Sequence, residues 1–395
     1  MGLEGAGVQF QIRDSIAEYS LMDFCEAAED VLAMATCIAS IPAPTFYEEA
    51  RLKQVERYWT ESGLEVRRDG AGNLWAKIRE GTGPALMVCA HADTVFSAEV
   101  PHQFSEESGR LVGPGIGDNS LGVAAISKLA QILPETVAGR VWIVATTAEE
   151  GIGNLAGVTH ALQNPPEPIG GIVAIEGTLF GSLVTTAVGS VRWRVALEGE
   201  GGHAWHAAST PSAIHVLGRL IAKLDELGNR WQPSATVNVG RIGGGEGINI
   251  RAKGSWFELD IRADDQATLD SVTHEVAELF ESVEGVAVLP TVIGQRPAGK
   301  IDHDHPLVRS ASDALIQVGV TGRHIAASTD ANAGYPFGIP AITIGIAYGG
   351  NEHTTKEWIE IESIESGLEA LSLTLTYSLE SLGMEEHQNS DPHCV

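Results

Sequence analysis

The sequence predicts an α/β fold with a mixed, mostly parallel sheet that carries helices on both faces, and an α+β domain inserted into it. The main observation is a set of continuous apolar runs, which are typical of parallel strands buried on both sides. They lie at 85–90, 141–147, 172–176 and 341–346. A second observation is the change to alternating polar and apolar residues after Gly189, which indicates half-exposed strands of another sheet. The length of 395 residues also favours two domains over one.

Helices and strands alternate along the first part of the chain, up to residue 189. They are helices within 20–64 interrupted at Pro42 and Pro44, a glycine-turned hairpin at 65–78, the strand at 85–90, a helix at 120–133 and the strands at 141–147 and 172–176. The chain returns to this domain with a helix at 306–318, the strand at 341–346 and a helix at 361–382. The sequence therefore predicts that residues 1–189 and 299–395 form one domain.

Residues 190–298 indicate the inserted domain. Its predicted elements are a strand at 191–197, a helix at 209–228, strands at 235–242 and 255–261, a helix at 266–283 and a strand at 286–289. The order β-α-β-β-α-β is that of the split βαβ, or ferredoxin-like, motif.

The composition excludes some classes of partner. Lys and Arg number 25 against 52 Asp and Glu, for a formal charge of −27. Nucleic acid and anionic membrane surfaces are therefore not expected as partners, because both require a basic face. Cys25, Cys37, Cys89 and Cys394 show no spacing typical of a disulfide framework or a thiolate zinc site. Together with the lack of a signal-peptide pattern or a membrane-spanning run, this predicts a cytoplasmic protein.

Metal-ligand residues follow each of the four apolar runs. His91 and Asp93 follow the first, Glu149-Glu150 the second, Glu176 the third, and His353 comes after a glycine-bearing loop beyond the fourth. In open α/β sheets, ligands bind beyond the carboxyl ends of the strands. Buried charge at these ends is costly unless it is paired or binds metal. The sequence therefore predicts a metal site at one edge of the sheet.

The spacing of the candidates suggests individual roles. On a strand, His91 and Asp93 point the same way, so His91 can bind metal while Asp93 accepts from its other ring nitrogen. The alternative is a core histidine beside a polar neighbour. Asp118 lies in a glycine-rich loop that opens a helix, where it either caps the helix or bridges two metals. Side chains of Glu149 and Glu150 diverge, so one can bind metal while the other faces the attacking water. Glu176 alone also fits a surface acid.

A charge count favours two metal ions. Asp118, Glu150 and Glu176 bring three negative charges, so two divalent cations and one bridging hydroxide would balance the site. Metal lowers the pKa of bound water to roughly 7, which yields a nucleophile at neutral pH. Glu149 would take the proton and pass it to the leaving amine. Imidazole and carboxylate ligands without thiolate suit Zn²⁺, and Co²⁺ or Mn²⁺ would also fit.

These motifs resemble those of the di-zinc aminoacylase and exopeptidase family, which includes peptidase T, glutamate carboxypeptidase, acetylornithine deacetylase and succinyl-diaminopimelate desuccinylase. The matching segments are His91-Ala92-Asp93, Gly117-Asp118-Asn119, Glu149-Glu150, Glu176, Glu352-His353-Thr354-Thr355 and the inserted domain at 190–298, so the resemblance covers nearly the whole chain. It implies a zinc-exopeptidase fold in which His91, Asp118 and Glu176 bind one metal and Asp118, Glu150 and His353 the other. It also implies that Glu149 is the general base and Asp93 the orienting carboxylate.

The resemblance further implies that the inserted domain is a lid and dimerisation domain. Gly201-Gly202-His203 is similar to the family's Gly-x-His turn, whose histidine reaches the partner subunit's site and stabilises the oxyanion. His203 is therefore the expected catalytic residue and His206 a spectator, and the alternative is that both are surface residues. A homodimer through residues 190–298 follows.

Three further residues are similar to substrate contacts of the family. Asn249 and Arg262 match residues that bind the substrate carboxylate, a role suited to the guanidinium fork. Arg262 has an alternative as the partner of Asp260 or Asp264. Asp330 lies in a loop near the substrate and either meets an amino group or supports that loop.

The predicted function is a binuclear metal hydrolase that cleaves an amide bond in a small peptide or N-acyl amino acid, using a metal-bridging hydroxide and a glutamate base. Two departures leave the substrate open: Asn119-Ser120 replaces the Lys or Met common after the bridging Asp, and Ala252 replaces a common proline. One alternative is hydrolysis of a non-peptide C–N bond, such as a carbamoyl or aryl amide, for which Trp205 would suit an aromatic group. Another is a non-catalytic binding protein, which the presence of Glu149 opposes.

Overall fold

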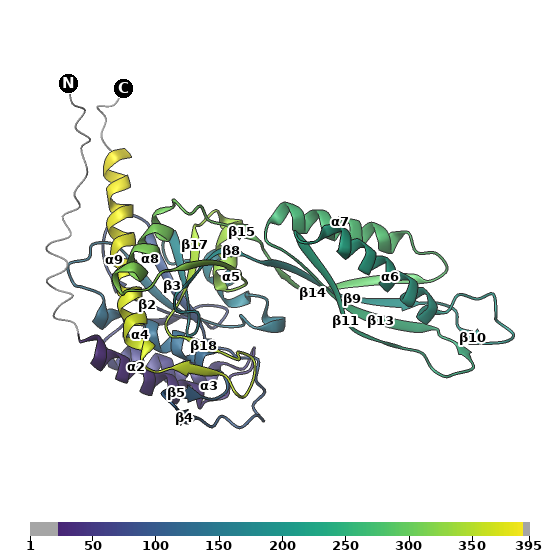
Figure 1. The fold of residues 1–395 in the computed structure, drawn as a ribbon, viewed down its shortest axis with the longest axis horizontal. Helices are drawn as coiled ribbons and strands as arrows, with labels where there is room; N and C mark the ends of the chain where they lie inside the picture. The colour runs from purple at the N-terminus through teal and green to yellow at the C-terminus, as the bar shows by residue number, and fades with distance from the viewer. Residues whose placement is uncertain (1–22, 390–395) are drawn as a thin grey trace, which may run out of the picture.

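The computed structural model describes residues 23–389, with side chains to residue 381, as two bodies joined by a narrow waist (Figure 1). Residues 20–22 of the first predicted helix and Cys394 lie outside this range. The larger body contains both ends of the described chain, and the smaller one is an insertion between them. This architecture confirms the predicted fold class, whereas the predicted domain limits at 189/190 and 298/299 stay predictions.

A nine-stranded mixed sheet forms the larger body, in the order β1-β2-β6-β3-β7-β17-β8-β15, with β16 also paired to β8. The four central strands β6, β3, β7 and β17 are parallel to one another. The strands are β1 (Val66–Arg68), β2 (Leu74–Arg79), β3 (Ala85–His91), β6 (Val141–Thr146), β7 (Ile169–Glu176), β8 (Ser182–Ala187), β15 (Gly299–Lys300), β16 (Arg323–Ala327) and β17 (Ala341–Gly345). The continuous apolar runs identified in the sequence are thus central parallel strands.

Helices cover both faces of this sheet because alternate strand residues point to opposite sides. Leu86 and Val88 pack into the core beneath one set of helices, whereas Met87 and Cys89 pack into the core on the other face. The first set is α2 (Phe24–Ala39), α3 (Glu49–Glu61), α4 (Gly122–Ile132), α8 (Pro306–Gln317) and α9 (Ser363–Asn389). The second consists of α5 (Ala156–Gln163) and the helical turn η3 (Asp330–Phe337).

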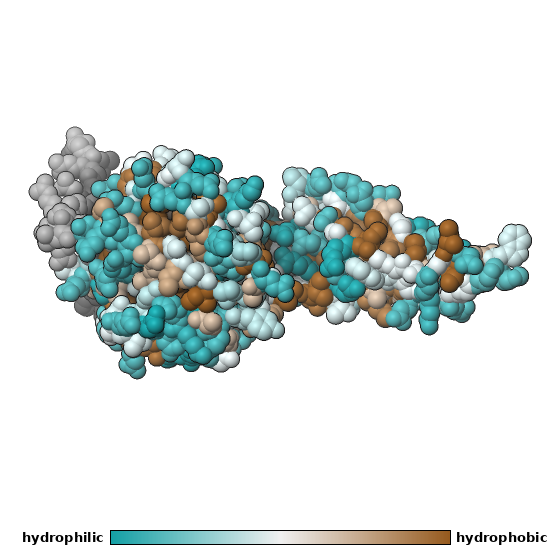
Figure 2. Space-filling view, turned by 90° about the horizontal axis from the view of Figure 1, so that it is seen from below, coloured by the Kyte–Doolittle hydropathy of each residue, from teal (hydrophilic) through white to brown (hydrophobic). Residues whose placement is uncertain are grey.

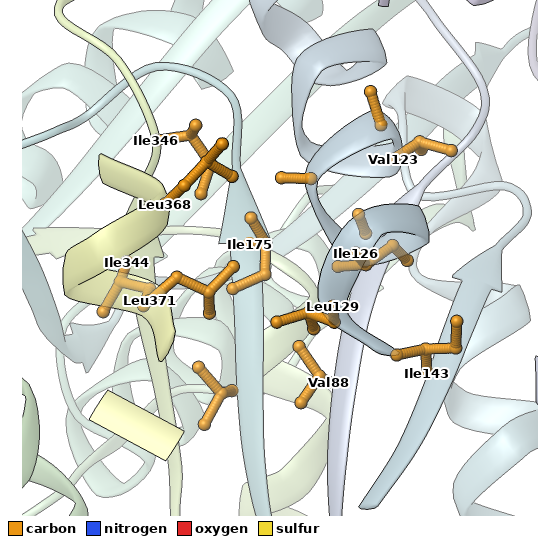
Figure 3. Packing of buried hydrophobic residues seen from close by; sticks show 14 of the residues in the cluster. Val88, Val123, Ile126, Leu129, Ile143, Ile175, Ile344, Ile346, Leu368 and Leu371 are labelled. Atoms are coloured by element: carbon orange, nitrogen blue, oxygen red, sulfur yellow. The ribbon is translucent and has the colours of Figure 1, made fainter. Parts of the chain in front are cut away.

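Figure 3 shows the packing on the first face. Ile126 and Leu129 of α4 face Val88 of β3 and Ile143 of β6. Leu371 of α9 lies over the neighbouring strands β7 and β17. Each such aliphatic side chain is fully buried and contributes about 1.5–3 kcal/mol relative to exposure. This packing makes the carboxyl edge of the central strands a rigid platform.

The smaller body is a four-stranded antiparallel sheet with two helices on one face. Its strand order, β11-β13-β9-β14, is that of a ferredoxin-like domain. The elements are β9 (Gly189–Glu198), β10 (Gly202–His203), α6 (Ala213–Trp231), β11 (Ala235–Gly244), β12 (Ile250–Arg251), β13 (Gly254–Ala263), α7 (Gln266–Glu281) and β14 (Ala287–Arg296). The predicted alternation is present in β9, where Val191, Trp193, Val195 and Leu197 enter the core.

Several short elements were not predicted. They include α5, β8 and β16 in the larger body, and a small sheet of β4 (Ser105–Glu107), β5 (Arg110–Val112), β18 (Gly349–Gly350) and β19 (Trp358–Glu360). Their sequences are too short or too polar to give a periodic signal. In the described part of the chain, no helix combines the length and the apolar character that a membrane crossing requires.

Candidate metal centre

The predicted metal ligands meet at the carboxyl edge of the central parallel strands. His91 is the last residue of β3, Glu176 is the last residue of β7, and Glu150 follows β6. These three strands are neighbours in the sheet, so their ends lie side by side. Asp118 comes from the loop before α4, and His353 comes from the loop between β18 and β19.

Two groups of potential ligands share Asp118. His91, Asp118 and Glu176 form one group, and Asp118, Glu150 and His353 form the other, with the ligand atoms of each group within 4.8 Å of one another. One carboxylate oxygen of Asp118 lies 3.1 Å from His91 Nε2, and the other lies 3.0 Å from His353 Nε2. This is the arrangement expected of a carboxylate that bridges two ions.

The outer carboxylates complete each group. Glu176 Oε2 lies 3.8 Å from His91 Nε2, and Glu150 Oε1 lies 3.2 Å from His353 Nε2. His91 and Glu150 are buried, whereas the side chain of His353 is 56% exposed. The centre is therefore closed at its base and open at the side of His353.

The protonation equilibria show that this cluster attracts positive charge. Burial alone would lower the pKa of the His91 imidazole, but hydrogen bonds to Asp118 and Asp93 outweigh it and raise that pKa well above its usual range. Hydrogen bonds to Asp118 and Glu150 raise the pKa of His353 to about 10. Burial raises the pKa of Glu176 well above its usual range. Nitrogen and oxygen donors around two positions that favour cations fit two divalent metal ions.

Asp93 is fully buried beside His91 and the neighbouring glutamates. Its Oδ1 accepts a hydrogen bond from the Glu149 amide at 3.0 Å, and its Oδ2 accepts from the Glu150 amide at 2.9 Å and from Thr45 Oγ1 at 2.9 Å. Nδ1 of His91 lies 3.5 Å from Oδ1 and 3.2 Å from the backbone oxygen of Asp93. The Asp93 carboxylate therefore holds the backbone of Glu149-Glu150. Because His91 Nδ1 lies nearer to the backbone oxygen of Asp93 than to its carboxylate, the orienting role of that carboxylate stays a prediction.

Glu357 holds the loop that carries Asp118. Its carboxylate accepts hydrogen bonds from the amides of Gly117 and Asp118, both at 2.7 Å, and of Gly115 at 3.1 Å. Burial raises the pKa of Glu357 to about 8. Helix α4 begins at Gly122, so Asp118 does not act as its cap. Glu357 was not predicted, because its partners lie about 240 residues away in the sequence.

Two residues near the start of α3 hold the backbone at the carboxyl edge of the central strands. Glu48 Oε1 accepts from the Ala148 amide at 3.1 Å, next to Glu149. Arg51 is fully buried and donates to the carbonyl of Ala92 at 3.0 Å, between His91 and Asp93. Neither residue was predicted. In the sequence they are only charged residues at the start of a helix, which is a common pattern.

The candidate base, Glu149, is buried and paired with Arg296. Arg296 Nη1 lies 2.7 Å from Glu149 Oε1, and Nη2 donates to the Glu149 carbonyl. Burial raises the pKa of Glu149 to about 8, although Arg296 opposes this shift. A carboxylate with this pKa can exchange a proton near neutral pH. Arg296 also was not predicted.

The candidate lid residues lie apart from the ligand groups. His203 lies in β10 at the far end of the smaller body, and Asn249 precedes its partner strand β12 (Figure 1). Both are exposed, and the His206 ring lies 4.8 Å from that of His203. Arg262 on β13 is exposed as well, with Nε 2.6 Å from Asp260 Oδ2, so the alternative ion pair is present. Figure 2 shows polar and hydrophobic residues intermingled on this body.

Asp330 is buried at the start of η3. Its Oδ2 accepts a hydrogen bond from Thr146 Oγ1 at 2.6 Å, at the end of β6. Burial raises its pKa. This contact is the one expected of a residue that supports the loop, the second of its two predicted roles.

Comparisons with known proteins concern the family and the fold. A model of peptidase family M20/M25/M40 matches residues 87–377. The acetylornithine deacetylase of Vibrio atlanticus is 23% identical over 314 residues, which cover 73% of this chain and 82% of that protein. A tripeptidase from Staphylococcus aureus superposes with a TM-score of 0.77 at 21% identity, covering 89% of this chain and 99% of that one. A dinuclear metal-binding peptidase from Bacillus subtilis gives 0.68 at 17% identity, covering 90% and 99%.

Proposed function

Because this chain belongs to peptidase family M20/M25/M40 and is therefore a hydrolase acting on C–N bonds, we propose that it cleaves an amide bond beside a free carboxylate in a small peptide or N-acyl amino acid. The family assignment confirms the resemblance seen in the sequence. The observation that carries the proposal is the pair of ligand groups that share Asp118, with the buried carboxylate of Glu149 beside them.

Two divalent ions are the proposed cofactors. His91, Asp118 and Glu176 would hold one, and Asp118, Glu150 and His353 the other. When bound, such ions polarise the scissile carbonyl and make water a stronger nucleophile at neutral pH. Zn²⁺ suits these imidazole and carboxylate donors best, and Co²⁺ or Mn²⁺ would also fit.

Glu149 is the proposed general base. It accepts a proton from the attacking water and delivers it to the leaving amine, and this transfer contributes about 10²–10⁴-fold in comparable enzymes. In the metal-free protein burial raises the pKa of Glu149 to about 8, and two bound cations beside it would favour the ionised form that accepts the proton. Asp93 keeps the His91 ring and the Glu149 backbone in place during these steps.

The smaller body, residues 190–298, is the proposed lid and dimerisation domain, and residues 1–189 with 299–395 form the catalytic domain. Asn249 and Arg262 would bind the substrate carboxylate, and His203 of a partner subunit would donate to the developing oxyanion. All three residues are exposed on a body separate from the ligand groups. This supports a role in which they contact the substrate only after the lid closes over it. Asp330 would support the substrate loop through Thr146.

A cytoplasmic location is proposed as well, since the three described cysteines are free, as in a reducing compartment. No feature of the site favours a non-peptide C–N bond over an amide. Trp205 is 82% exposed at the lid, but it contacts neither ligand group.

The proposal is tested by turnover of a substrate panel with the metal-loaded enzyme. Dipeptides, tripeptides and N-acyl amino acids are compared with N-carbamoyl amino acids, and release of the free amino acid is measured. We expect hydrolysis of an amide substrate, and we expect Glu149→Gln to lower kcat by about 10²–10⁴-fold while both metals stay bound. Glu80→Gln is the matched control, because Glu80 is an exposed glutamate of the catalytic body. Full turnover by Glu149→Gln would refute the assignment of the base.

A further inference from the structure

We infer that Arg296 is a positioning residue that holds the carboxylate of Glu149 and links it to the root of the lid. This inference rests on the proposed function, because it takes Glu149 to be the base. It assigns a role to a buried arginine that belongs to neither ligand group.

The guanidinium of Arg296 donates two hydrogen bonds to Glu149. Nη1 donates to Oε1 of the carboxylate at 2.7 Å, and Nη2 donates to the backbone carbonyl of the same residue. Nη1 also lies 3.1 Å from Ser328 Oγ. Both side chains are buried, at 7% and 6% exposure, so solvent does not screen the pair. The planar guanidinium presents a separate nitrogen to each of the two acceptors, whereas a lysine ammonium has a single nitrogen.

Arg296 lies where the chain passes between the two bodies. It is the last residue of β14 and pairs with Ser190 at the start of β9, so both connections of the lid run side by side here. They are packed tightly, because a Cβ on Gly189 would lie 2.6 Å from the amide nitrogen of Ala298. The arginine therefore reaches from the waist of the molecule into the active site.

Two other contacts join the lid root to the segment that follows Glu149. Arg192 Nη1 of β9 donates to the Gly151 carbonyl at 3.2 Å, and Asn154 Nδ2 donates to the Ile293 carbonyl of β14 at 3.3 Å. With the contacts of Arg296, three sets of hydrogen bonds thus join the segment 149–154 to the root of the lid. A rotation of the lid about the waist would act on this segment and, through Arg296, on the Glu149 carboxylate.

Loss of the arginine should therefore affect the chemical step more than substrate binding. Without it, the Glu149 carboxylate would be buried without its cationic partner and free to leave its position beside the ligand groups. A misplacement of about 1 Å can lower a rate by about 10²-fold. The metal ligands keep their own support from Asp93 and Glu357, so metal content should not change.

The test compares Arg296→Ala and Arg296→Lys with the wild type by kcat, KM, bound metal and Tm. We expect Arg296→Ala to lower kcat by about 10²-fold with little change in KM or metal content. Arg296→Lys should recover part of this loss, since it restores the charge but not the second donor nitrogen of the planar fork. Arg194→Ala is the matched control: it removes a lid arginine that pairs with Glu258 and leaves Glu149 untouched, so its kcat should equal that of the wild type.

A double-mutant cycle decides whether Arg296 acts through Glu149. In the Glu149→Gln background, Arg296→Ala should cause little further loss, because the group that it positions is gone. Additive losses, a wild-type kcat in Arg296→Ala, or a loss of metal equal to the loss of activity would each overturn the inference. If Arg296→Ala does not fold, the comparison of Arg296→Lys in the two backgrounds decides in the same way. An active Glu149→Gln enzyme would instead refute the proposed function, so the two failures are distinguishable.

Discussion

The strand-end centre and the smaller body, which is the proposed lid, differ in how their candidate residues are held. At the centre, Asp93, Asp118 and Glu150 are each fixed by hydrogen bonds or ion pairs with several partners. In the proposed lid, His203 is exposed on a two-stranded ladder at the end of the body, and Asn249 is exposed just before the second strand of that ladder. The centre is built on strands whose opposite faces are both covered by helices, whereas the lid ladder has no such cover.

This difference separates two tasks. Chemistry needs groups held in place before the substrate arrives, and buried strand ends provide that rigidity. Closure over a substrate needs a body that can move, and exposed residues on a body joined by two strands suit it. The comparison leads to four predictions. In the first two, loss of a metal ligand should remove metal, and a change in the proposed lid should not.

The largest effect is expected from Asp118→Asn. Asp118 contributes one oxygen to each histidine, so the variant weakens both ligand groups at once. We expect both metals to be lost and turnover to fall to background, as measured by elemental analysis and by substrate hydrolysis. Asp304→Asn, an exposed aspartate of the same body, is the control. Retention of two metals with normal turnover would show that Asp118 does not bridge.

A smaller effect is expected from His203→Ala in the lid. Removal of one oxyanion donor lowers kcat by about 10²–10³-fold in comparable enzymes. Metal content should stay at the wild-type value, since His203 belongs to neither ligand group. His206→Ala is the matched control, because its ring neighbours that of His203 and it should have normal turnover. Loss of metal in His203→Ala would contradict the separation of the two regions.

Mixed dimers extend this prediction to the partner subunit. Glu149→Gln and His203→Ala alone should each have a kcat at least about 10²-fold below that of the wild type. If His203 acts across the interface, a heterodimer of the two variants contains one complete site, with Glu149 from one chain and His203 from the other. Co-expression with two affinity tags should then restore activity. An inactive heterodimer would show that His203 acts within its own chain or not at all.

The sequence predicted the centre better than its supports, for a physical reason. His91, Glu150 and Glu176 directly follow or end long apolar strands, so their convergence follows from the rule for parallel sheets. Glu357 and Arg296 act through contacts with residues about 240 and 147 positions away, and no local pattern encodes such a pairing. The helix α5 and the strand β8 were missed because each is short and has little periodicity.

The smallest expected effect is the release of protons when metal binds. It distinguishes the two regions in the wild-type protein, without a substitution. A histidine or carboxylate must lose its proton before it binds metal. In the metal-free centre, Asp118 and Glu150 raise the pKa of His353 to about 10, and burial raises that of Glu176. His353 therefore holds a proton at neutral pH that metal must displace, and the raised pKa of Glu176 acts in the same direction.

Apparent metal affinity should consequently rise with pH and level off above about pH 10, where His353 is already neutral. The slope should be about tenfold per pH unit for each proton released. Calorimetric titration of the metal-free protein in buffers of different ionisation enthalpy counts these protons directly. The His203→Ala variant should release as many as the wild type, because the lid lies outside the ligand groups. Metal binding without proton release at pH 7 would mean that the carboxylates do not hold His353 in its charged form. The prediction that the centre, unlike the lid, releases protons when it binds metal would then be wrong.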